Sequence, residues 1–351
     1  MKKTLAPLRH GLVLAGLVFF PANGESSGST AIQIASSAEW KTDFGKAIVP
    51  LFEIQSGGPP KDGIPAIDEP RFETASQIEN LGESEPVMVL RHGSEVRAYP
   101  FRILMYHEIV NDTVAGTPVA VTYCPLCNAA IVFDRRINGE VTTFGTTGRL
   151  RNSDLVMYDR ATESWWQQFT GKAIVGRHAG KVLETLPSST EAFGPFRKAN
   201  PDAKVLIPNN PDLRPYGRNP YVAYDTTRMP FLYRGNLPEG MPAMARVVVI
   251  PGSDETAPPT IVALDALENG VFEQGNSRIR QTGTVASALD DSDITNGRPV
   301  MEITVTRDGE LVTAHETFAF VAHAFHPGTP IIGEDRMTAP VSSVEHPSLR
   351  P

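Results

Sequence analysis

The only two cysteines among the 351 residues lie in one short stretch, Tyr123-Cys124-Pro125-Leu126-Cys127-Asn128. Pro125 has a fixed φ angle that suits the second position of a β-turn, and Asn128 suits the exit from that turn. The flanking segments 119–123 and 129–133 are rich in β-branched and aromatic residues, which favours paired strands. The sequence therefore predicts that both cysteines lie at the end of a β-hairpin.

A second hairpin signal follows the first directly. Asn138-Gly139 lies between the strand-like segments 133–137 and 141–144, and this dipeptide is typical of two-residue hairpin turns. We therefore expect the cysteine hairpin to extend into a three-stranded meander. Upstream, the apolar spacing of Phe101–Ile109 predicts a helix, with His107 and Glu108 in its last turn.

The second half of the chain repeats landmarks of the first half in the same order. The strand-like segment 246–250 corresponds to 86–90, and a predicted helix at 261–267 corresponds to the helix at 101–109. The cysteines have no counterpart in the second half. We therefore predict an α+β fold of strand-rich meanders with a few short helices, formed by two weakly related halves through internal duplication.

The N-terminus has the features of a secretory signal peptide. Lys2 and Lys3 precede an apolar run from Gly11 to Phe20, and small residues follow at the positions required for cleavage. The run is too short for a typical membrane span, so a membrane anchor is the weaker alternative. We expect an exported protein, periplasmic or extracellular, that is not stably inserted in a membrane after cleavage.

These signals divide the chain into six segments. The predicted organisation is a signal peptide (1–24), a disordered or irregular segment (25–60), the cysteine-bearing first half (61–205), a connection (206–240), the degenerate second half (241–331) and a tail (332–351).

The charge of the chain narrows the classes of partner. The formal net charge is −8, and loss of Lys2, Lys3 and Arg9 with the signal peptide changes it to −11. This acidity argues against nucleic acid and anionic lipid as partners. The expected partner is therefore a small molecule, a metal ion or a protein thiol.

The cysteine pair has three alternative explanations, of which a metal site is the one we favour. Cys124, Cys127 and His107 would bind copper or zinc, because thiolate and imidazole ligands suit soft and borderline ions. The fourth ligand would be water, Asp134 or Glu108. Only three protein ligands are evident, whereas structural zinc sites normally have four.

Glu108, Asp134 and Arg151 are the candidates for a supporting shell around the ligands. Arg151 belongs to a dense polar run that also contains Arg149, Asn152 and Asp154. This run either binds an anionic ligand beside the thiols or forms a solvated loop, and we favour the loop.

The second alternative is a catalytic thiol–disulfide pair, in which one thiol attacks and the other resolves the mixed disulfide. Such pairs usually open a helix that stabilises the thiolate, whereas the residues after Cys127 predict a strand. The third alternative is a non-catalytic ligand-binding module in which a structural disulfide closes the turn. A four-residue loop makes that disulfide worth only roughly 2 kcal/mol. These alternatives leave open whether the protein is an enzyme.

Several longer motifs stand out in the first half of the chain. They include Asp62-Gly63-Ile64-Pro65-Ala66-Ile67-Asp68, His107-Glu108-Ile109-Val110-Asn111-Asp112, Val121-Thr122-Tyr123-Cys124-Pro125-Leu126-Cys127 and Leu155-Val156-Met157-Tyr158-Asp159-Arg160. These motifs resemble a bacterial family, the domain-of-unknown-function family DUF3179. The resemblance covers roughly residues 60–235 well and the second half poorly. It implies that the His and Cys motifs are important, and it supplies no reaction.

Overall fold

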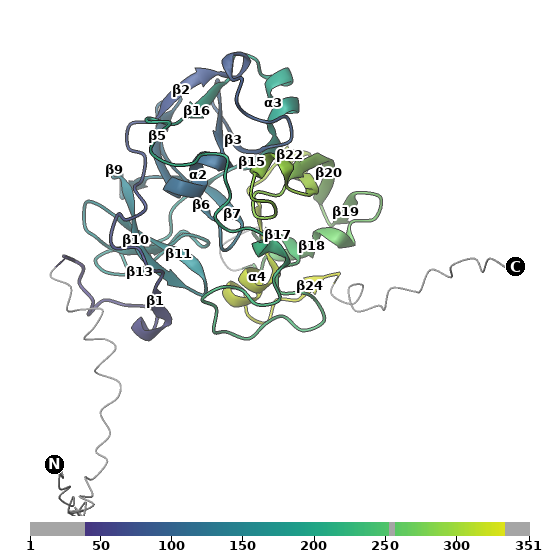
Figure 1. Ribbon diagram of the computed structural model, residues 1–351. Coiled ribbons are helices and arrows are strands. Elements are labelled where there is room, and N and C mark those ends of the chain that lie inside the picture. The colour runs from purple at the N-terminus through teal and green to yellow at the C-terminus, as the bar shows by residue number, and fades with distance from the viewer. Residues whose placement is uncertain (1–38, 253–256, 334–351) are drawn as a thin grey trace, which may run out of the picture.

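The computed structural model describes residues 39–252 and 257–333 (Figure 1). The predicted signal peptide and most of the predicted tail lie outside the described residues, as does the first part of the segment 25–60. Within the described ranges, no helix is long and apolar enough to cross a membrane.

The described chain is strand-rich, with 42% strand and 12% helix, and its sheets are arranged as a five-bladed β-propeller. The prediction of an α+β fold with two halves is therefore wrong. The helices form no layer of their own, because each α-helix has only seven residues, about two turns. These helices are α2 (Phe101–His107), α3 (Phe193–Ala199) and α4 (Ala319–Phe325).

The two cysteines lie in a four-stranded antiparallel sheet. Its order is β14 (Thr185–Leu186), β7 (Ala129–Asp134), β6 (Thr117–Cys124) and β5 (Ile109–Val114). Cys124 pairs with Ala129 at the end of the β6–β7 hairpin, so the predicted cysteine hairpin is present. Asn138 and Gly139 do form a tight turn, at φ angles of 56° and 85°. The strands that they join, β8 (Arg136–Ile137) and β9 (Glu140–Val141), pair only with each other, so the meander consists of β5, β6 and β7 instead.

A five-stranded sheet follows the cysteine sheet along the chain and supplies the rest of the site. Its order is β1 (Ile54–Ser56), β10 (Phe144–Arg151), β11 (Asp154–Asp159), β12 (Trp165–Gln167) and β13 (Lys172–Val175). Trp165 and Trp166 are both completely buried in it, on opposite sides of β12. The 3₁₀ helix η1 (Leu51–Glu53) leads into this sheet.

Two other sheets repeat one arrangement. One has the order β15 (Ser188–Ala192), β3 (Pro86–His92), β4 (Glu95–Pro100), β16 (Lys204–Ile207) and β2 (Arg71–Thr74); the other has the order β23 (His315–Phe318), β17 (Arg246–Ile250), β18 (Thr260–Ala263) and β24 (Ile331–Ile332). In each, a short helix precedes a strand that adds in parallel: α3 precedes β16 and α4 precedes β24. The structure therefore repeats a single sheet with its short helix, whereas the sequence predicted a repeat of half the chain.

The remaining sheet has the order β19 (Val271–Gln274), β20 (Ser277–Ala286), β21 (Pro299–Arg307) and β22 (Glu310–Leu311). The helix predicted at 261–267 is wrong. Ile261 and Val262 pair with β17 as part of β18, as β-branched residues favour, and only the 3₁₀ helix η4 (Leu264–Ala266) follows. The other 3₁₀ helices are η2 (Ala75–Gln77), η3 (Tyr224–Thr226) and η5 (Ile294–Asn296).

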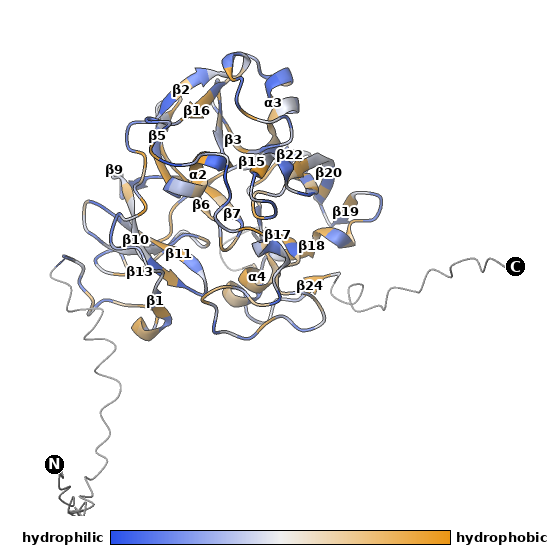
Figure 2. Ribbon diagram, viewed as in Figure 1, coloured by the Kyte–Doolittle hydropathy of each residue, from blue (hydrophilic) through white to orange (hydrophobic). Residues whose placement is uncertain are grey.

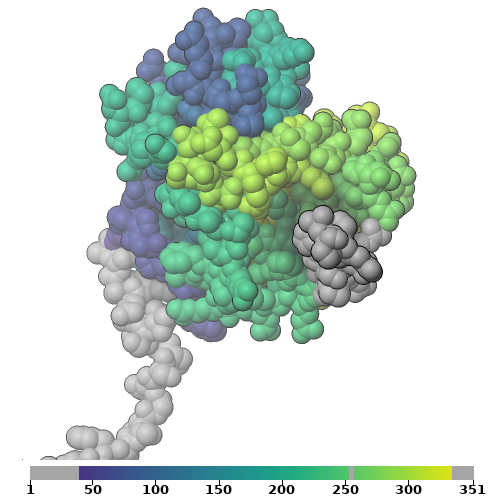
Figure 3. Space-filling model, turned by 45° about the vertical axis from the view of Figure 1, so that its right-hand side comes forward, coloured from purple at the N-terminus to yellow at the C-terminus, as the bar shows by residue number. Residues whose placement is uncertain are grey.

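Segments from both ends of the described chain share one core. Figure 3 shows the green and yellow C-terminal segments packed directly against the blue segments of the early strands. The Phe318 amide donates to the Cys127 carbonyl at 3.3 Å, which attaches β23 to the cysteine turn. Figure 2 shows hydrophobic residues on the inner strands and hydrophilic residues on many outer loops. The largest cluster of buried hydrophobic residues includes both cysteines.

Candidate metal centre

The turn between β6 and β7 holds the two thiols in a fixed relation. The Cys127 amide donates to the Cys124 carbonyl at 3.2 Å, and the Asn128 amide donates to the Pro125 carbonyl at 3.1 Å. Asn128 has a φ of 51°, in the left-handed region that asparagine tolerates better than most residues. Proline and asparagine therefore set the turn as the sequence predicts.

A carboxylate meets the two sulfur atoms. One ligand atom from each of Cys124, Cys127 and Asp154 lies within 4.8 Å of the other two, and all three residues are buried. The Cys127 thiol donates to Asp154 Oδ1 at 3.2 Å, and both thiols approach the Ser153 carbonyl, at 3.8 Å from Cys124 and 3.5 Å from Cys127. Both cysteines are free thiols. This group could hold a metal ion.

Asp154 was not predicted as a ligand, because the polar run that contains it favoured a solvated loop. In the structure Asn152 and Ser153 turn the chain with φ angles of 53° and 64°, and Asp154 begins β11 with no exposed surface. A polar residue that opens a hydrophobic strand directly after a tight turn was the available signal, since strand residues adjoin the core.

Neighbouring groups fix the Asp154 carboxylate. Its Oδ2 accepts hydrogen bonds from Gln167 Nε2 at 2.6 Å and from the Phe169 amide at 3.0 Å. Burial raises the pKa of Asp154 to about 6, although these hydrogen bonds oppose the shift. The side chain is therefore held in place with one oxygen directed at Cys127.

The same burial suppresses ionisation of the thiols. Burial raises the pKa of Cys124 and, more strongly, that of Cys127, and the charge of Asp154 adds to both shifts. A buried thiol without a positive neighbour keeps its proton and is a poor nucleophile. A bound cation supplies the missing positive charge and displaces these protons.

His107 does not join the group. Its Nδ1 lies 2.7 Å from the Pro65 carbonyl and its Nε2 lies 2.7 Å from the Tyr216 hydroxyl, so both ring nitrogens have partners elsewhere. Burial lowers the pKa of His107, which favours the neutral ring. The structure therefore does not bring His107 to the thiols, because Pro65 and Tyr216 hold both of its ring nitrogens.

Of the predicted supporting residues, Glu108 is the one beside the centre. Burial raises the pKa of Glu108 to about 8, and the charge of Asp154 contributes to this shift. The charge of Glu108 in turn raises the pKa of Cys124. Its carboxyl group nevertheless lies outside the group of ligand atoms within 4.8 Å of one another, and the residue keeps 8% of its surface exposed.

Arg151 and Asp134 have different positions. Arg151 donates to Glu53 at 2.8 Å and to Gln167 Oε1 at 3.5 Å, so it contacts the residue that holds Asp154. Asp134 lies at the far end of β7 from the turn and accepts hydrogen bonds from Arg136 at 3.0 Å. The structure therefore does not bring Asp134 to the thiols.

One known protein family matches the chain over most of its length. The family model described as "Protein of unknown function (DUF3179)" matches residues 61–329. The chain belongs to this family. The match runs through the C-terminal sheets as well as the cysteine sheet, so family membership covers nearly the whole described structure. No curated protein and no solved structure matches the chain.

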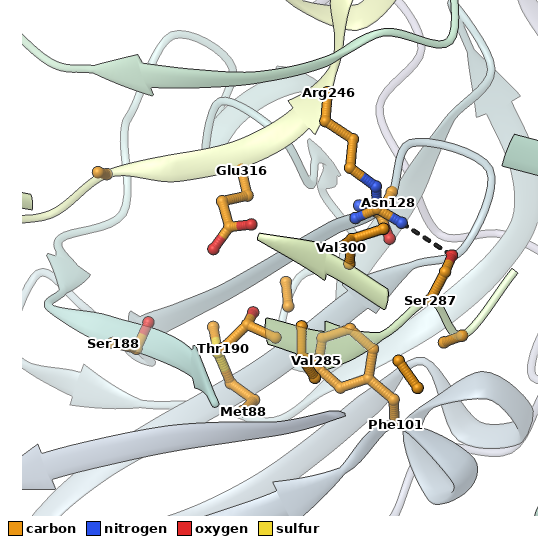
Figure 4. Close-up of a pocket in the computed structure, with 14 residues that line it drawn as sticks. Met88, Phe101, Asn128, Ser188, Thr190, Arg246, Val285, Ser287, Val300 and Glu316 are labelled. Carbon is orange, nitrogen blue, oxygen red and sulfur yellow. Dashed lines mark hydrogen bonds between the residues drawn. The ribbon is translucent and has the colours of Figure 1, made fainter. Parts of the chain in front are cut away.

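A small cavity adjoins the cysteine turn at Asn128 (Figure 4). Its volume is about 30 Å³, and its polar lining includes Asn128, Arg246 and Glu316. The Arg246 Nε is buried and has no hydrogen-bond partner among the described residues. Burial raises the pKa of Glu316 to about 7. The cavity has room for about two ordered water molecules. Such waters would give the Arg246 Nε a hydrogen-bond partner.

Residues 208–245, which overlap most of the predicted connection (206–240), form turns and η3 and cover the centre. The Tyr224 hydroxyl donates to the Leu126 carbonyl at 3.1 Å, and the Ser153 hydroxyl donates to the Phe231 carbonyl. Both cysteines are at most 1% exposed beneath this cover. Solvent and large molecules therefore have no direct contact with the sulfur atoms in this conformation.

Proposed function

We propose that the protein binds one zinc ion through Cys124, Cys127 and Asp154. The observation that carries the proposal is the convergence of two sulfur atoms and one carboxylate oxygen within 4.8 Å. Zinc accepts both thiolate and carboxylate ligands in tetrahedral sites. Copper, the other ion considered from the sequence, is favoured less because Cu(I) prefers soft ligands throughout.

Glu108 is the candidate for the fourth ligand. Its carboxyl group interacts electrostatically with Cys124 and Asp154, and it would have to move towards the three ligand atoms to bind the same ion. A cation at the centre would favour the ionised form of this carboxyl group. A ligand set of this kind would let the protein hold zinc firmly in a site closed to solvent.

The alternative of a redox dithiol has less support. Its nucleophile would need a lowered pKa and access to a partner, whereas both thiols are buried and burial raises their pKa. The chain continues from the turn into β7, so no helix N-terminus stabilises a thiolate. We retain export, inferred from the N-terminal sequence, as part of the proposal.

Elemental analysis combined with thiol titration tests this function. Protein purified from its exported compartment without added metal should contain about one zinc per chain, and Cys124→Ser should lose it. His107→Gln should keep the zinc, since this ring lies outside the ligand group. Metal-free protein with two thiols that react readily in the folded state would contradict the proposal and support the redox function.

A further inference from the structure

A large groove lies beside α2, which contributes Arg102 and Ile103 to its lining. Its volume is about 690 Å³, within the range of small-molecule binding sites. Pro208, Pro211 and Pro215 contribute apolar rings on a backbone of restricted φ, whereas Ile103 and Leu206 lie beneath the groove and are at most 1% exposed. A groove lined by exposed, conformationally restricted apolar rings is suited to an organic ligand.

Arg214, at the edge of this groove, carries a charge that the protein does not balance. Its side chain is half-buried, and its Nε is buried without a hydrogen-bond partner. Among the described residues, no carboxylate forms an ion pair with this guanidinium group. Arginine stays charged in proteins, so burial without a partner costs free energy that a bound anion would recover.

The other charged residues that line the groove do not neutralise the positive charge of Arg214. Arg102 is already paired with Glu85 and donates to the Asn80 carbonyl at 2.7 Å. Glu73 and Glu79 are exposed, so water screens them, and Arg71 is exposed and forms no ion pair among the described residues. The unbalanced charge in the protected part of the groove is therefore positive.

Tyr216 is another lining residue of the groove, and its amide donates to the Arg214 carbonyl at 2.8 Å. Burial raises the pKa of Tyr106 and of Tyr216, and the charge of Arg214 opposes both shifts. The two rings contact each other edge to face, with centroids 5.8 Å apart. The Tyr216 hydroxyl is held in turn by His107. These contacts prepare a binding position for an anionic head group.

We propose that this groove binds a small organic acid. Its carboxylate pairs with the guanidinium group of Arg214, and its apolar body lies against the rings of Pro208, Pro211 and Pro215. The proposal does not depend on the zinc centre, because none of the groove's lining residues is a proposed zinc ligand.

The probe that tests this proposal is 2-aminobenzoate, a fluorescent aromatic carboxylate, with the neutral 2-aminobenzamide as its matched control. Equilibrium dialysis with the full chain should give one saturable site for the acid and binding at least 10-fold weaker for the amide. Arg214→Gln should weaken binding of the acid at least 10-fold. Arg228→Gln removes the same charge from an exposed position outside the groove and should change it less than 2-fold.

Two further measurements make the result decisive. Arg214→Lys keeps the charge and loses the planar fork, so it should retain an affinity between those of the native protein and Arg214→Gln. The thermal unfolding midpoint of each variant should match the native protein, which shows that the fold is intact. Equal affinity for acid and amide, equal effects of Arg214→Gln and Arg228→Gln, or no saturable binding would each overturn the proposal.

Discussion

The thiol centre and the Arg214 groove differ in burial and in charge. The centre groups two thiols with Asp154 and Glu108 away from water, so every ionisation there adds negative charge. The groove is open and contains an unpaired guanidinium group. Excess negative charge at the centre favours a cation as its ligand, and excess positive charge in the groove favours an anion. The deeper burial of the centre favours tighter binding there than in the open groove.

The largest expected effect on metal binding concerns the ligand role of Asp154. Asp154→Asn should weaken zinc binding on the order of 1000-fold, about 4 kcal/mol, because one of three charged ligands becomes a neutral amide. Asp134→Asn is the matched control and should leave zinc affinity unchanged, since Asp134 is paired with Arg136 away from the centre. Competition with a zinc-binding dye measures both values. Equal losses in the two variants would remove Asp154 from the ligand set.

The largest expected effect on stability is the pH dependence of the metal-free protein. The pKa of Glu108 in the folded state is about 8, above the usual value for glutamate, so folding retains a proton that the unfolded chain releases. The stabilisation is therefore complete below about pH 4.5 and is lost as the pH rises towards 8, by about 5 kcal/mol. Glu108→Gln should reduce the slope of the free energy of unfolding over this range, as measured by urea titration, and leave the smaller contribution of Asp154 below about pH 6. The exposed Glu79→Gln should leave the slope unchanged.

A smaller effect is expected where β23 contacts the cysteine turn. The buried Thr317 hydroxyl donates to the Cys127 carbonyl at 2.8 Å. Thr317→Val keeps the shape and loses this hydrogen bond, so stability should decrease by about 1 kcal/mol in chemical denaturation. Thr282→Val removes an exposed hydroxyl bonded to the Glu302 carbonyl and should cost less than about half of that. A neutral Thr317→Val would show that β23 does not help to hold the turn.

The smallest effect distinguishes the two regions by salt. Raising the salt concentration from about 0.05 M to 0.5 M should weaken 2-aminobenzoate binding about threefold, because ions screen charges in an open groove. Zinc affinity should change less, because the centre is buried and screening there is weak. Parallel titrations at the two salt concentrations measure both responses. A stronger salt response of the centre would reverse the proposed contrast in burial.

Local sequence determined the elements that depend on neighbouring residues. Pro125 and Asn128 set the cysteine turn, Asn138-Gly139 set the next one, and the apolar spacing of Phe101–His107 set α2. Each of these is stabilised by hydrogen bonds within a few residues. Family membership was also predicted from continuous motifs in the sequence, and the match over residues 61–329 confirms it.

Only the tertiary structure decided which side chains meet the sulfur atoms. Asp154 reaches Cys127 across 27 positions of sequence, through the turn between β10 and β11, whereas the nearer His107 is directed to Tyr216, 109 positions away. The five-sheet arrangement and the unpaired charge of Arg214 have the same origin. Strand partners and ion pairs between distant residues depend on how the sheets pack, and local preferences do not encode that packing.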